Sequence, residues 1–129
     1  MSESYAPDRF NRAVPYLTIE GADAVVDFLV DVFGAEVFDR VFRSDGKLAH
    51  AAVLIGDSVI EVSETTERFG PMPCAIHIYV PDTDEAHRRA IQHGVQVIHE
   101  PMDMEYGERA SAVKDLAGNH WYIATFVRP

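Results

Sequence analysis

Three histidines and one glutamate occupy positions that could carry out chemistry. His77 and His120 lie in segments of alternating character, IHIYV and NHWYIAT, while His50 and Glu61 each lie in another predicted strand. Imidazole can donate or accept a hydrogen bond, ligate a metal ion or move a proton near neutral pH. If two strands bring His77 against Glu61, the pair could act as a general base and its orienting group, or could anchor a polar ligand. The alternative for each histidine is an ordinary hydrogen bond to a neighbouring strand.

Tyrosines recur in the same kinds of segment as these histidines. Tyr16, Tyr79 and Tyr122 each alternate with aliphatic neighbours. A phenol offers a flat apolar face and one polar group, so these side chains could stack on a planar ligand or donate a hydrogen bond to it. Packing inside the protein is the alternative for all three.

Composition and charge exclude several kinds of partner. The chain has 129 residues, 47% of them apolar, which is typical of one globular domain. Its 21 acidic and 11 basic residues give a net charge of -10, which repels nucleic acid and anionic lipid. Cys74 is the lone cysteine, so no internal disulfide can form. We expect a cytoplasmic protein with neither a nucleic-acid nor a membrane partner.

The elements that must position these residues follow one order twice. Each half of the chain reads as strand, helix and three strands, and the halves are joined by a linker rich in glycine and proline. Ile19 and Val80, and likewise Val14 and Ala75, are 61 residues apart, as expected for a duplicated unit. The predicted parts are a flexible arm at 1–12, a first module at about 13–64, a linker at 65–73 and a second module at about 74–127.

Turn and helix signals mark the borders of these elements. Gly34 follows an amphipathic helical pattern at the place where a glycine ends a helix. The Asp45-Gly46 and Gly56-Asp57 pairs predict hairpin turns. The segment at 83–93 has helical spacing, and Asp82 with Glu85 has the spacing of a capping box.

The sequence resembles the glyoxalase/bleomycin-resistance/dioxygenase superfamily, also called the vicinal oxygen chelate fold. The resemblance covers 14–126 and rests on the paired strand-helix-strand pattern together with AHAAVLIGDSVIEV and YGERASAVKDLAGNHWYIAT. It implies an α+β fold in which two βαβββ modules form a U-shaped, eight-stranded mixed sheet around a cavity. The helices would lie on the convex face, and the protein would form a homodimer.

Strand alternation assigns side chains to the inner and outer faces of that sheet. The segment at 100–108, with four acids, two methionines and Tyr106, is expected to be a loop at the mouth of the cavity. It could be an adaptable, cation-attracting lip or simply a solvated loop. The predicted ligand-binding residues are Tyr16, Thr18, His50, Glu61, His77, Tyr79, Tyr106, His120 and Tyr122.

In metal-binding members of this superfamily, His or Glu side chains from the first and last strand of each module hold a divalent cation. The resemblance maps those four positions onto Val14, Glu61, Ala75 and Tyr122. Only Glu61 could ligate, and stable sites use three or four protein ligands. We therefore expect no metal and no other cofactor.

Two hypotheses of function follow. The first is a metal-free protein that binds a small aromatic or cationic molecule, as drug-resistance members do. The second is a glyoxalase-like lyase, isomerase or epimerase in which Glu61 and His77 transfer a proton or hold a residual metal ion. A dimer whose cavity is unused is a third possibility.

Overall fold

Residues 5–127 of the chain are described by a computed structural model, and they form two modules of one design. The predicted order of strand, helix and three strands is confirmed in both. Module 1 contains β1 (Tyr16–Ile19), α1 (Ala22–Phe33), β2 (Glu36–Phe42), β3 (Leu48–Ile55) and β4 (Ser58–Glu64). Module 2 contains β5 (Ala75–Tyr79), α2 (Thr83–Ile91), β6 (Gln96–Met104), β7 (Glu108–Lys114) and β8 (His120–Phe126).

Each module has its own four-stranded mixed sheet. The strand orders are β1-β4-β3-β2 and β5-β8-β7-β6, and the first strand pairs with the fourth in parallel. The predicted α+β fold of two βαβββ modules is confirmed, and its eight strands form two four-stranded mixed sheets with no strand pairing between them in the described part of the chain. β1 and β5 are edge strands, and the free side of β1 is bridged by Met72 of the linker.

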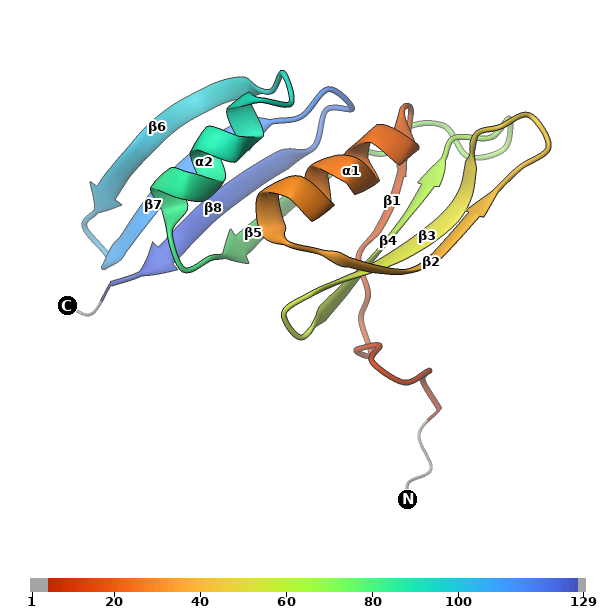
Figure 1. Ribbon diagram of the computed structural model, residues 1–129, viewed down its shortest axis with the longest axis horizontal. Coiled ribbons are helices and arrows are strands. Elements are labelled where there is room, and N and C mark those ends of the chain that lie inside the picture. Colours follow the sequence, from red (N-terminus) through yellow and green to blue (C-terminus); the bar gives the residue numbers. More distant parts are fainter. Residues whose placement is uncertain (1–4, 128–129) are drawn as a thin grey trace.

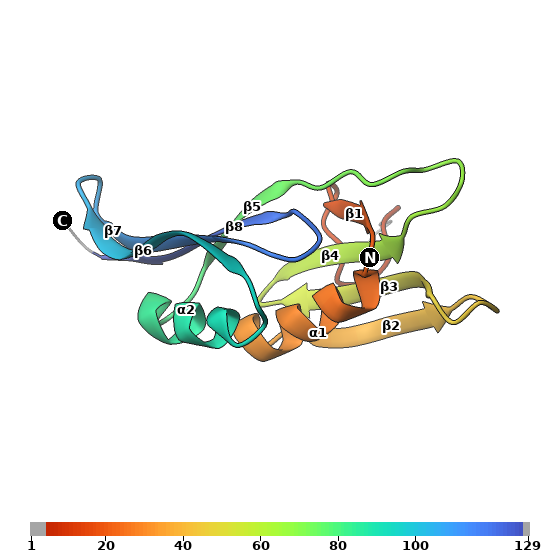
Figure 2. The ribbon, with the colours of Figure 1, turned by 90° about the horizontal axis from the view of Figure 1, so that it is seen from above.

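Both helices pack on their own sheets and against each other, as Figure 1 shows. The joint between the modules is aromatic: Trp121 of β8 lies 5.8 Å, between ring centroids, from both Phe28 and Phe33 of α1. Trp121 is fully buried, and its indole nitrogen donates a hydrogen bond of 2.7 Å to Asp115. Helix α1 of one module therefore shares a core with the last strand of the other, and the two modules lie side by side (Figure 2).

The start of α1 is stabilised by a carboxylate from a distant strand. Gly21 at the N-cap has no side chain to accept from the helix, and its φ is 77°. Glu64, at the end of β4, is 8% exposed and accepts from the backbone N–H groups of Gly21 and Ala22 at 3.2 Å. Thr125 of β8, 61 residues after Glu64, accepts from the backbone of Thr83 at the start of α2. The duplicated unit thus uses the same position to cap its helix in each module.

The segment at 100–108 is mostly strand, so the predicted loop is wrong. β6 continues through Pro101 to Met104, and only residues 105–107 form the turn. Proline is tolerated because β6 is an edge strand, where one missing N–H donor costs no ladder bond. The pairing with β7 also shifts between His99 and Met102, as at a β-bulge.

The predicted arm at 1–12 lies partly outside the described residues, which begin at Tyr5. Residues 5–12 form no helix or strand, and they contact β2. Arg9 forms an ion pair of 3.1 Å with Glu36, and Phe10 packs edge-on against Phe38. The flexibility of the arm stays a prediction. Neither helix of the described chain has the length and apolar character needed to cross a bilayer.

We predict that Glu64→Gln lowers the free energy of unfolding by about 1 kcal/mol, because the amide keeps an acceptor but loses the negative charge that a helix N-terminus favours. Urea denaturation followed by circular dichroism measures the change. Glu67→Gln removes the same charge from an exposed linker position and should leave stability unchanged. Equal effects of the two substitutions would contradict the capping role.

Candidate functional site

The side of the module 1 sheet away from α1 carries a row of three hydrogen-bonded polar side chains. Nδ1 of His50 lies 2.7 Å from Oδ2 of Asp39, and Nε2 lies 2.7 Å from Oε1 of Glu61. The ring of Tyr16 lies 6.2 Å from the imidazole, between centroids. We call these four residues the module 1 face. The backbone places them because Tyr16 is paired with Glu61, and Glu61 with the β3 residue two positions after His50.

The two carboxylates favour a protonated His50. Ionised carboxylates only accept hydrogen bonds, so an imidazole that faces one on each side needs both of its N–H groups. Partial burial of His50 opposes the charge, but the hydrogen bonds to Glu61 and Asp39 outweigh it and raise the pKa of His50 above its usual value. The module 1 face therefore favours an imidazolium between two carboxylates.

Within the described residues of one chain, Glu61 and His77, the predicted dyad, lie in different sheets and have different partners. Glu61 has His50 as its partner, and His77 lies near Glu108 and Tyr79 instead. Within residues 5–127, no hydrogen bond, ion pair or ring contact joins the module 1 face to the corresponding face of module 2.

The module 2 face is aromatic and contains one buried carboxylate. The rings of His77 and Tyr79 lie 4.7 Å apart, and Tyr122 stands edge-on to His77 at 6.5 Å. Tyr79 donates a hydrogen bond from its hydroxyl to Oε2 of Glu108. We define the module 2 face as His77, Tyr79, Glu108, His120 and Tyr122.

The hydrogen bond to Glu108 keeps Tyr79 a phenol. That bond, with smaller contributions from desolvation and from the charges of Glu108 and Tyr106, raises the pKa of Tyr79 above its usual value. Tyr106 itself lies in the β6–β7 turn and is 67% exposed. His120 stands next to Tyr122 on β8, at 6.3 Å between ring centroids. Thr18 is half-buried, and its carbonyl accepts a backbone hydrogen bond from Met72.

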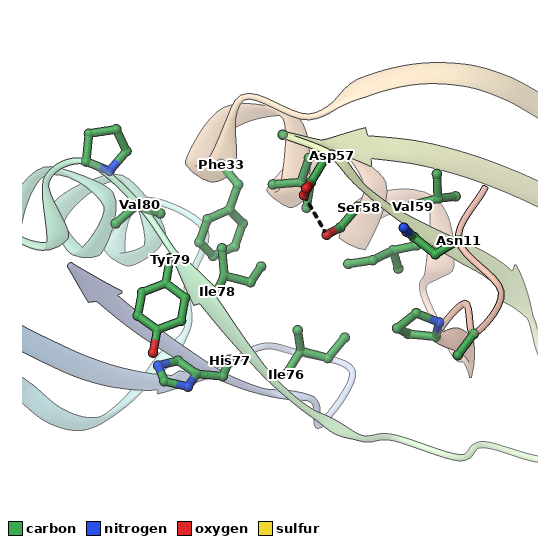
Figure 3. Close-up of a pocket in the computed structure, with 16 residues that line it drawn as sticks. Asn11, Phe33, Asp57, Ser58, Val59, Ile76, His77, Ile78, Tyr79 and Val80 are labelled. Atoms are coloured by element: carbon green, nitrogen blue, oxygen red, sulfur yellow. Dashed lines mark hydrogen bonds between the residues drawn. The ribbon is translucent and has the colours of Figure 1, made fainter. Parts of the chain in front are cut away.

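A cleft of about 670 Å³ opens where the modules meet, between β5, the β3–β4 hairpin and the end of the arm. In Figure 3 the side chains of Ile76 and Ile78 point toward Phe33, while His77 and Tyr79 project from the other side of β5. The walls of the cleft are largely apolar, and the polar residues that line it include Asn11, Asp57 and Ser58. The cleft touches the module 2 face and does not include Glu61 or His50.

The four positions that correspond to metal ligands do not form a metal-binding set. Val14 and Ala75 have no donor atom, and the Tyr122 ring stands against His77. Glu61 is hydrogen-bonded to His50, whose two nitrogens face opposite carboxylates, so the three side chains form a row and do not converge on one point. No cluster of three His, Cys, Asp or Glu residues suited to a metal ion occurs in residues 5–127.

Two polar side chains of module 2 lie outside both faces. Arg109 pairs with Asp84 and Asp103. His87 of α2 is 3% exposed, and its Nδ1 lies 2.9 Å from the hydroxyl of Ser111.

Sequence reasoning missed two acids of the faces. Asp39 follows a register shift in β2, so simple alternation along the strand does not predict on which face of the sheet its side chain lies. Glu108 was assigned to the predicted loop at 100–108, whereas it is the first residue of β7. Its position directly before an alternating strand was the available signal.

Comparisons with known proteins give one family model and several similar proteins and structures. The model of the Glyoxalase/Bleomycin resistance protein/Dioxygenase superfamily matches residues 9–123. An uncharacterized protein of Mycobacterium bovis is 34% identical over 125 residues, which cover 88% of this chain and 82% of that protein. The crystal structure of TioX from a Micromonospora species has a TM-score of 0.75 at 27% identity and covers 91% of this chain and 99% of its own. TnmS3, an antibiotic binding protein from a Streptomyces species, has a TM-score of 0.67 at 16% identity, over 88% and 93%.

We predict that His50 titrates above 6.5 and that Asp39→Asn lowers its midpoint, because one of two carboxylate partners is lost. A histidine NMR titration measures both values. Since the folded pKa is raised, the stability contributed by this row is full below the unfolded pKa and is lost as pH rises through the folded pKa. Urea denaturation below and above the measured midpoint tests that sign. Asp57→Asn, in an exposed hairpin, should not move the midpoint.

Proposed function

Because the chain belongs to the Glyoxalase/Bleomycin resistance protein/Dioxygenase superfamily, we propose that it binds a small aromatic or cationic molecule without a metal ion. The observation that carries this proposal is the hydrogen bond between Glu61 and His50. Glu61 has the one ligating side chain at the four positions where metal-dependent members of the superfamily hold their cation. Here that carboxylate is hydrogen-bonded to His50, and the two residues paired with it across the sheet, Tyr16 and Ala52, have no carboxylate, imidazole or thiol group.

The exposed aromatic side chains support a planar or cationic ligand. Tyr16 is 49% exposed, Tyr79 58% and Tyr122 39%, although all three project from sheets whose other sides are tightly packed. Exposed rings of this kind offer stacking surface and attract cations. The net charge of -10 favours a cation over an anion as well. TnmS3, which shares the fold, is an antibiotic binding protein.

A homodimer would bring the two faces together. Among residues 5–127 of one chain no hydrogen bond, ion pair or ring contact joins the module 1 face to the module 2 face, and each face leaves tyrosine surface open to solvent. A second copy related by a twofold axis can set the module 1 face of one chain opposite the module 2 face of the other, twice over. The proposed binding site is therefore shared between two chains.

We predict that native mass spectrometry of freshly purified protein shows a dimer without a stoichiometric metal ion. Isothermal titration calorimetry should then detect binding of 2-naphthylmethanol, a neutral planar probe. Tyr16→Ala and Tyr122→Ala should each weaken that binding by about tenfold, because each removes a stacking surface worth about 1 kcal/mol or more.

Tyr5→Ala is the matched control, since Tyr5 is an exposed tyrosine outside both faces. It should bind the probe as the unmodified protein does. One tightly held zinc, nickel, iron or manganese ion per chain would overturn the metal-free proposal. If the Tyr16→Ala and Tyr122→Ala variants both bind the probe as tightly as the unmodified protein does, the proposed site is overturned.

A second candidate is a lyase, isomerase or epimerase that uses Glu61 to move a proton. It is favoured by the row of Asp39, His50 and Glu61, in which one carboxylate orients the imidazole that contacts the other. In this candidate His77 could join Glu61 only across the proposed dimer, because within one chain the two residues lie in different sheets. For this candidate we predict that Glu61→Gln abolishes turnover of an α-hydroxycarbonyl or acyl-CoA substrate but leaves its binding intact. Unchanged turnover would refute it.

A further inference from the structure

Glu108 is a buried carboxylate with one oxygen unused. The residue is 8% exposed, and Oε2 accepts the hydrogen bond from Tyr79. Oε1 is buried and has no hydrogen-bond partner among the residues that the structure describes. The nearest basic atom is Nε2 of His77, at 3.6 Å, which is too far for a hydrogen bond. Leaving a buried neutral acceptor without a hydrogen bond costs about 1–3 kcal/mol of stability, and leaving a charged acceptor in that state costs more.

No arginine or lysine of the described chain neutralises this carboxylate. Arg109, the next residue, points to the opposite side of β7 and is held by Asp84 and Asp103. Lys114 shares the face of Glu108 but lies six residues along the strand, at about 20 Å. The negative charge of Glu108 is therefore directed at the aromatic cluster of the module 2 face.

Small residues in the sheet make the cluster possible. Tyr79 lies on β5 and Glu108 on β7, so the tyrosine side chain must cross β8 to reach the carboxylate. It crosses at Ala124, which is paired with Tyr79 on one side and with Ala110 of β7 on the other. Both alanines are buried, while the tyrosine is 58% exposed. The Tyr79 ring thus covers the alanines with one side and presents the other side outward. A phenol that donates to a carboxylate has a more electron-rich ring, which attracts a cation more strongly.

We propose that the module 2 face binds an organic ammonium group, with its charge over the Tyr79 ring and an N–H group donating to Oε1 of Glu108. His77 is 44% exposed on its side chain and makes no hydrogen bond in the described chain, so the ligand displaces this ring to reach Oε1. The inference rests on the proposed binding function and narrows it: the ligand is an amine with N–H groups, protonated at neutral pH.

The test compares three probes that share one ring system: 2-naphthylmethanol, protonated 2-naphthylmethylamine and the quaternary 2-naphthylmethyl(trimethyl)ammonium. Calorimetry in about 0.15 M salt limits long-range attraction by the acidic chain. We expect the primary ammonium to bind about tenfold more tightly than the alcohol, and more tightly than the quaternary ion, which has no N–H.

Glu108→Gln should abolish the preference for the ammonium and leave the affinity for the alcohol unchanged. Glu105→Gln removes the same charge from the exposed turn nearby and should keep the preference, so it controls for overall charge. Tyr79→Leu provides a second variant at an exposed position, and it should also reduce the ratio of ammonium to alcohol affinity. Near-ultraviolet circular dichroism shows whether each variant is folded.

The outcomes separate this inference from the proposed function. If the alcohol binds and the ammonium has no advantage, or if Glu105→Gln and Glu108→Gln act alike, the ammonium site is overturned and the binding function stands. A quaternary ion that binds as well as the primary ammonium would overturn the role of Oε1. If no probe binds to the unmodified protein, both proposals fail.

Discussion

The packing of Trp121 against α1 is the contact on which the arrangement of the whole chain depends. Trp121 belongs to the last strand of module 2, while Phe28 and Phe33 belong to the helix of module 1. Since the two sheets share no strand pairing, this aromatic joint and the contact between α1 and α2 hold the modules together. Asp115 binds the indole nitrogen and the Asn119 amide, so the turn between β7 and β8 is fixed to the same core.

This joint determines which surfaces remain open. Once both helices and the helix-facing sides of the two sheets are buried, the sides away from the helices are left for ligands or for another chain. Those sides carry most of the exposed tyrosine and three carboxylates in hydrogen-bonded networks. The two faces have different electrostatics, because the module 1 face places an imidazole between two carboxylates whereas the module 2 face leaves Glu108 without a cation.

The duplication explains how one design produces two such faces. Glu64 and Thr125 occupy equivalent positions and cap their helices in equivalent ways, so the scaffold is retained. Glu61 and Tyr122, 61 residues apart as well, have diverged in chemistry. Substitutions at solvent-facing strand positions leave the core intact, and the same fold can therefore carry faces of different chemistry.

Local signals determined the elements. The helical spacing before Gly34 predicted α1, and the alternation in 58–64 predicted β4, because both patterns follow from backbone geometry over a few residues. The wrong prediction of a loop at 100–108, which included Glu108, concerns the edge strand β6. Pro101 weakens the local strand signal there, and only the neighbouring strand β7 completes the pairing. The sequence also predicted that His50, His77, Glu61 and the three tyrosines lie on the sheet faces away from the helices.

Tertiary structure alone decided which of these side chains meet. Glu61 has His50 as its partner because β3 is the hydrogen-bonded neighbour of β4, whereas His77 stands in another sheet. Tyr79 reaches Glu108 only because two alanines of β8 and β7 lie between them. From the sequence by itself one could read the residue types and the sheet faces on which they lie. The partners depend on strand order and on the packing of distant segments, which no local pattern encodes.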